Sequence, residues 1–245
     1  MVQLKSISRI LFALTCLILA AACTPTSDST SPTATPEIDP ELLSGQAVKF
    51  LTEDGLVLVG TMYGQNPQAV LFSNMDRTLR HEWNDLAREL AAKGYMTLIF
   101  DYRGYDLSQG EPDTTMIVED LKAAISFIHS QGIEDLALVG ADLGGWAIGK
   151  LAGGEDLSAV VIMSSRAVQD EEIQAIAAPK LFIHSADESG TGSVSMNHMF
   201  RVATEPKEQI IFPSEFRGTT LFLTEHKDQL IEQVVTFIED KMPVN

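Results

Sequence analysis

Residues 136–145 read Leu-Ala-Leu-Val-Gly-Ala-Asp-Leu-Gly-Gly, and this stretch decides the fold. Its first four residues are apolar, which is typical of a short strand buried on both faces. Gly140 and Gly144 leave room for neighbouring backbone to approach. Asp142 tolerates a left-handed backbone better than a branched residue would. The stretch therefore predicts a buried strand, a sharp turn at Asp142 and a helix that begins at Leu143.

The spacing around the turn matches the nucleophile elbow G-x-S-x-G, with Asp142 in place of the serine. In an elbow the central side chain stands at the carboxyl end of a strand and above the N-terminus of the next helix. Open α/β sheets bind ligands at this edge. The helix dipole also favours an anion there, so an ionised Asp142 is electrostatically suited to the position.

Strands and helices alternate from Gln46 onward, which predicts an α/β fold with a mostly parallel eight-stranded sheet and helices on both faces. The predicted strands are 47–51, 56–63, 69–73, 96–100, 136–139, 159–163, 180–184 and 209–212. The predicted helices are 82–93, 114–131, 143–151, 170–177, 193–202 and 224–241.

Residues 1–22 are predicted to be a signal peptide. Lys5 and Arg9 precede an apolar run of 13 residues from Ile10 to Ala22, whereas a membrane-spanning helix needs about 20. The run ends Leu-Ala-Ala-Ala before Cys23, which resembles a bacterial lipobox and implies that Cys23 is lipidated. The alternative is an ordinary secretory signal with an incidental cysteine.

Residues 23–45 are rich in Thr, Ser and Pro and are expected to form a disordered tether. Residues 46–245 are expected to form one domain. Cys16 lies in the signal peptide, so this domain has no cysteine for a disulfide or a thiolate nucleophile. A lipidated Cys23 would hold the protein on the extracytoplasmic side of a bacterial membrane, either periplasmic or at the cell surface.

The net charge of −17 bears on the partners of the protein. Without residues 1–22 the chain keeps 15 basic and 34 acidic side chains, and such a surface repels nucleic acid. The five histidines show no metal-ligand spacing, so no metal or other cofactor is expected. The expected partners are a lipid bilayer, through acylated Cys23, and a small-molecule ligand; no protein partner is indicated.

From about Gln46 the chain resembles the α/β-hydrolases, close to small dienelactone-hydrolase-like and lipoprotein esterases. The matching segments are 71–75 (LFSNM), Trp83, 94–105 (GYMTLIFDYRGY), the elbow at 140–145, 179–185 (PKLFIHS) and 217–219 (RGT). The resemblance implies the α/β-hydrolase fold. The segment 163–179, where a cap would stand, is short, so we expect no sizeable cap domain and an open active-site edge.

The resemblance implies a catalytic triad in the order nucleophile, acid, histidine. Asp142 stands at the nucleophile position. The acid follows the seventh strand, where counting favours Glu188 and leaves Asp187 as the second choice. The family pattern places a histidine directly before Gly-Thr, and this chain has Arg217 there.

Both departures remove the usual chemistry. Asp142 has no hydroxyl, and a protein arginine does not give up its proton, so Arg217 is no base. Asp142 and Arg217 are instead expected to form a charge-neutral, hydrogen-bonded pair, with Glu188 or Asp187 on the other side of Arg217. The sequence thus predicts a pseudoenzyme or ligand-binding module without esterase activity.

Two features leave room for chemistry. The oxyanion hole would survive, because backbone N–H groups of Leu143 and of Met75 or Asp76 would supply it. Alternatively, Asp142 acts as a covalent nucleophile on a small ester, haloalkane or epoxide, as in haloalkane dehalogenases and epoxide hydrolases. That chemistry needs a histidine to activate water, and the candidates are His184 and His226.

Overall fold

The structure is a computed structural model that describes residues 44–75, 78–188 and 192–244. These residues belong to one compact unit, Ile38–Asn245. The predicted signal peptide, the tether up to residue 43 with Cys23, and Asp76 lie outside the described residues. Within the described part, no helix has both the length and the apolar character needed to span a bilayer.

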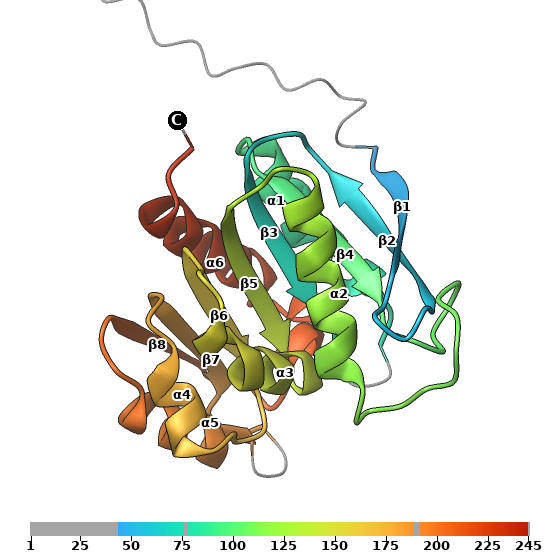
Figure 1. The fold of residues 1–245 in the computed structure, drawn as a ribbon. Helices are drawn as coiled ribbons and strands as arrows, with labels where there is room; N and C mark the ends of the chain where they lie inside the picture. Colours follow the sequence, from blue (N-terminus) through green and yellow to red (C-terminus); the bar gives the residue numbers. More distant parts are fainter. Residues whose placement is uncertain (1–43, 76–77, 189–191, 245) are drawn as a thin grey trace, which may run out of the picture. The chain divides into compact units, whose positions relative to one another are not determined.

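A single sheet of eight strands forms the centre of the described unit (Figure 1). Across the sheet the strands follow the order β1-β2-β4-β3-β5-β6-β7-β8. β2 is antiparallel to β1 and to β4, and every other neighbouring pair is parallel. The predicted α/β class with a mostly parallel sheet is confirmed. The strands are β1 (Gln46–Leu51), β2 (Val57–Tyr63), β3 (Gln68–Ser73), β4 (Met96–Asp101), β5 (Asp135–Ala141), β6 (Ala159–Met163), β7 (Lys180–Ser185) and β8 (Lys207–Phe212).

Helices cover both faces of the sheet and close two hydrophobic cores (Figure 1). The helices α1 (Asn84–Ala92) and α6 (Lys227–Lys241) pack on one face. The other face carries α2 (Ile117–Ser130), α3 (Leu143–Leu151), α4 (Asp170–Ala175) and α5 (Gly192–Val202). Short 3₁₀ turns lie at Arg80–Trp83, Ala152–Gly154 and Gly218–Leu223.

Alternation along the strands explains why there are two cores. Successive side chains of a strand point to opposite faces of the sheet. In β3, Phe72 therefore joins the core under α1 and α6, and Leu71 joins the core under α2 and α3. Each helix presents an apolar stripe to its core, as Leu86 and Leu90 do in α1.

The connection between β6 and β7 is short, and α4 is the one helix within it. In the part of the chain that the structure describes, no large cap therefore covers the edge of the sheet at which the parallel strands end. This agrees with the expectation from the sequence, and it leaves the loops after the strands to form the rim of the candidate site.

The helices α2 and α6 begin three residues later than the sequence indicates, because polar side chains form local turns ahead of them. The side chain of Asp113 accepts hydrogen bonds from the backbone and the hydroxyl of Thr115, so α2 begins at Ile117 and not at residue 114. The Thr224 hydroxyl accepts a hydrogen bond from the His226 backbone in the same way, and α6 begins at Lys227. Such local bonds compete with the helix.

Gly144 allows α3 to begin directly against the end of β3. A Cβ atom at Gly144 would lie 2.2 Å from the carbonyl oxygen of Ser73. The Gly144 N–H donates to the carbonyl of Asn74 at 3.0 Å, so the two backbone segments are joined at this point. The elbow therefore depends on the absence of a side chain at residue 144.

We expect Gly144→Ala to lower the free energy of unfolding by about 1–3 kcal/mol, because the added methyl group overlaps rigid backbone. Urea unfolding measures this change. Gly154→Ala is the matched control: a Cβ there meets no atom within 4 Å, and the stability should stay the same or rise slightly. Equal effects of the two substitutions would contradict the steric account.

Candidate functional site

Asp142 forms a sharp turn between β5 and α3. Its φ of 46° and ψ of −106° place a non-glycine residue in a region that L-residues rarely adopt. The backbone is held on both sides, since the Asp142 N–H donates to the Met163 carbonyl at 2.9 Å and the Asp142 carbonyl accepts from Trp146 at 2.9 Å. The strained turn that the elbow motif predicts is therefore present.

The carboxylate of Asp142 faces two arginines. Its Oδ1 lies 2.7 Å from Nη2 of Arg217 and 3.5 Å from Nε of Arg166. The Asp142 side chain is 7% exposed, whereas Arg217 is 32% and Arg166 is 53% exposed. A buried carboxylate thus contacts guanidinium groups that reach the surface. The contact with Arg217 is an ion pair without the alignment of a hydrogen bond, so the expected partners meet but the expected hydrogen bond is absent.

Glu188 does not complete an ionic triad with Arg217, and the sequence-based expectation of that contact is wrong. Its Oε2 accepts from the hydroxyl of Ser164 at 2.6 Å and from the backbone N–H of Ser185 at 3.2 Å. Within the described residues, its Oε1 has no hydrogen-bond partner. Asp187, the other candidate, is exposed at the surface. The buried acid therefore bonds a serine, and Arg217 is paired with Asp142.

Ser164 connects the acid to the loop that carries Arg217. It directly follows β6 and has a φ of 43°. Its hydroxyl donates to Glu188 and accepts from the backbone N–H of Gly218 at 2.9 Å. Sequence reasoning missed Ser164 and Arg166. Their one available signal was position, because both follow an apolar strand at the edge where open α/β sheets bind ligands.

The backbone segments expected to supply oxyanion donors lie next to each other. Leu143 is the first residue of α3, and Met75 follows Asn74, whose carbonyl accepts from Gly144. Asp76, the alternative donor, lies outside the described residues. The arrangement places Leu143 and Met75 on neighbouring chain segments beside Asp142.

A buried hydroxyl network fixes the segment before Met75. The Tyr102 hydroxyl lies 2.5 Å from the Ser73 hydroxyl and donates to the Asn74 carbonyl at 3.2 Å. Burial raises the pKa of Tyr102 above its usual range, and the negative charges of Asp120 and Asp142 act in the same direction. Tyr102 therefore stays protonated and serves as a neutral donor.

The loop after β4 is a structural rim. Arg103 forms ion pairs with Asp120 at 2.7 Å and with Asp54 at 2.9 Å. Burial raises the pKa of Asp120, while the hydrogen bonds from Arg103 lower it. Asp106 has a φ of 45° and pairs with Arg80. Through these contacts Arg103 and Asp106 fix the shape of the loop.

Both candidate histidines have other neighbours. The ring of His184 is buried, with Nδ1 3.0 Å from the Ser185 carbonyl and Nε2 3.3 Å from Nε2 of Gln209. The ring of His226 packs against Phe212, with 5.4 Å between the ring centroids. Across the described residues, no group of three His, Cys, Asp or Glu side chains is placed to hold a metal ion.

Comparison with protein-family models decides the family, since a model described as "alpha/beta hydrolase fold" matches residues 73–201. The chain belongs to the α/β-hydrolase family. This α/β hydrolase is 28% identical over 211 residues to the uncharacterized protein Rv2307c of Mycobacterium tuberculosis, covering 73% of this chain and 74% of that protein. It is 25% identical over 236 residues to the uncharacterized protein YfhR of Escherichia coli K12, and the match covers 81% of this chain and 82% of that protein.

Solved structures agree on the fold of this α/β hydrolase. The Pyrococcus furiosus esterase Pf2001 superposes with a TM-score of 0.71 at 16% identity, covering 86% of this chain and 99% of that one. The α/β hydrolase GrgF from a Penicillium species gives a TM-score of 0.71 at 16% identity, covering 81% and 99%. At such identities the likeness shows the fold alone.

A double-mutant cycle of Asp142→Asn and Arg217→Gln should give a coupling energy of about 1–2 kcal/mol in urea unfolding. This lies between exposed and buried ion pairs, because Asp142 is buried and Arg217 is a third exposed. The cycle with Arg166→Gln is the control and should give a smaller coupling, since that contact is longer. A coupling to Arg217 no larger than that to Arg166 would show that solvent screens the pair.

Proposed function

We propose that this α/β hydrolase is a pseudoenzyme, a ligand-binding module without esterase activity. The 2.7 Å contact between Asp142 and Arg217 carries the proposal. A serine esterase needs a hydroxyl nucleophile and a base with a pKa near neutrality. At the two positions that should supply them, this chain has a carboxylate and a guanidinium that neutralise each other.

The scaffold around the pair supports binding more than turnover. The strained elbow is intact, and the segments of Leu143 and Met75 adjoin it, so a carbonyl or an anion could still be received at this edge. Glu188, the remaining acid, is bonded to Ser164. The position that holds the base in a triad carries Arg217, which does not release its proton.

A second candidate function is hydrolysis of a small ester, haloalkane or epoxide through Asp142 as the covalent nucleophile. The observation in its favour is the conformation of Asp142, which is that of an elbow nucleophile. Two contacts weigh against it. Arg217 pairs with the carboxylate, and both ring nitrogens of His184 already contact other groups, the Ser185 carbonyl and the Gln209 amide.

We also propose that the protein is exported and anchored by lipid at Cys23. The support is the sequence alone, namely the short apolar run, the small residues before Cys23 and the Thr/Ser/Pro-rich stretch after it. Two or more acyl chains hold a protein stably on a bilayer.

Hydrolysis of p-nitrophenyl acetate by residues 38–245 tests the pseudoenzyme proposal. We expect the wild type and Asp142→Asn to show the same rate as buffer, because neither has a hydroxyl nucleophile with a base. A haloalkane and an epoxide are assayed beside the ester. Turnover by the wild type that disappears in Asp142→Asn would overturn the proposal and establish the second candidate.

Expression of the full chain in a bacterial host tests the anchor. The wild type should appear in the membrane fraction with a mass increased by acylation at Cys23, and Cys23→Ser should lose both properties. Cys16→Ser is the matched control and should behave as the wild type, since residue 16 lies within the signal peptide. A wild-type protein that is processed without acylation would indicate an ordinary secretory signal.

A further inference from the structure

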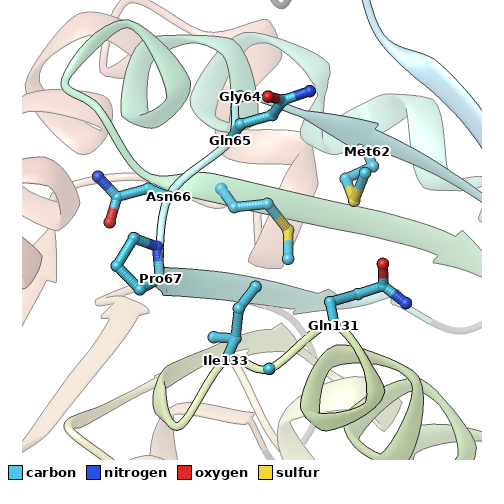
Figure 2. A pocket seen from close by; sticks show the side chains of 9 residues that line it. Met62, Gly64, Gln65, Asn66, Pro67, Gln131 and Ile133 are labelled. Atoms are coloured by element: carbon cyan, nitrogen blue, oxygen red, sulfur yellow. The ribbon is translucent and has the colours of Figure 1, made fainter.

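A cavity lies at the opposite edge of the sheet from Asp142, where the parallel strands begin (Figure 2). Its volume is about 420 Å³. It is lined by Met62 at the end of β2, residues 64–67 before β3, Met96 at the start of β4, and residues 131–133 between α2 and β5. Ligand pockets have volumes of this size, with an apolar lining and a few polar groups.

The walls of this cavity are held in place by contacts of their own. Gly64 has a φ of 70°, and a Cβ there would lie 2.3 Å from the Tyr95 carbonyl oxygen, so the loop rests on the start of β4. The Asn66 side chain accepts from the backbone N–H of Gln68 at 3.0 Å. On the other wall, the His129 ring lies 2.8 Å from the Ile133 carbonyl. The cavity is therefore formed before any ligand arrives.

The lining is uncharged, although the chain carries a net charge of −17. Among the described residues that line the cavity, the side chains are amides, thioethers, Ile133 and Pro67, without an acid or a base. A charged group that lost water here would find no opposite charge, and burial of an unpaired charge is costly. Met62 and Met96 are flexible apolar side chains that adapt to the shape of a ligand.

Gln131 is an exposed side chain at the rim of the cavity, and its Nε2 donates a hydrogen bond to the Ser130 hydroxyl at 3.1 Å. In Figure 2 its amide extends toward Met62 across the gap, while Ile133 stands beside it and the amide of Asn66 points to the other side. The amide oxygen of Gln131 accepts hydrogen bonds, so it suits a neutral head group with an N–H or O–H. We propose that this cavity binds an uncharged amphiphile, with its alkyl chain on Met62, Met96 and Ile133 and its head group bonded to Gln131.

Three probes that share an eight-carbon chain test whether the cavity prefers an uncharged head group: octanamide, octanoate and octylammonium. Each is added as monomers to residues 38–245 labelled at the methionine methyl groups, and NMR follows Met62 and Met96. Octanamide should shift both signals saturably, and octanoate and octylammonium should bind at least tenfold more weakly. Equal shifts with all three probes, or no shift with octanamide, would overturn the proposal.

The variant Met62→Glu should gain affinity for octylammonium, because it places a half-buried carboxylate in the cavity. The affinity for octanamide should fall at least fivefold, and octylammonium should become the probe that binds most tightly. The NMR signal of Met96 follows the binding of each probe. A protein that fails to fold could not show this gain. An unchanged order of the three probes would contradict the site.

Gln131→Leu tests the head group, and Gln174→Leu, an exposed glutamine on α4, is its matched control. Octanamide should bind Gln131→Leu at least fivefold more weakly and Gln174→Leu as the wild type; equal binding to both would overturn the role of Gln131. Competition by phosphatidylcholine vesicles would identify bilayer lipid as the source of the ligand, and its absence a free molecule. These results do not depend on catalysis at Asp142.

Discussion

The reversal of the chain at Asp142 is the constraint on which the rest of the structure depends. Gly144 lets the first turn of α3 touch the backbone of Ser73 and Asn74, and so the helix packs against β3 as well as β5. Loops after the six parallel strands then meet at one edge. The carboxylate of Asp142 faces Arg217, in the loop after β8, and Arg166, in the loop after β6.

Charge decides what this edge can do. A nucleophile and its base exchange a proton, whereas a carboxylate and a guanidinium share an electrostatic attraction and keep their protonation states. The pair satisfies a buried anion that would otherwise destabilise the fold. The Ser164 hydroxyl bonds both the acid Glu188 and the Gly218 N–H. An ion pair and these hydrogen bonds thus join the loops after β5, β6, β7 and β8.

The sequence predicts the regular elements well where an apolar run has sharp ends. Residues 159–163 and 143–151 have the predicted bounds, while α2 and α6 start late because Asp113 and Thr224 form turns that periodicity does not reveal. The approach of Asp142 and Arg217 was predictable from the resemblance to the α/β-hydrolases, in whose fold these two positions touch. The partner of Glu188 was not, since it depends on side-chain directions in a short loop. The cavity near Gln131 joins three segments that share no motif.

NMR of the arginine side chains tests most directly whether Asp142 and Arg217 form a lasting pair. A guanidinium held by a carboxylate rotates slowly about its Cζ–Nη bonds, so the account predicts separate Nη signals for Arg217 in the wild type. Those signals should merge in Asp142→Asn, where the charge is lost and the shape is kept. A single averaged signal for Arg217 in the wild type would contradict the pairing and leave Asp142 available as a nucleophile.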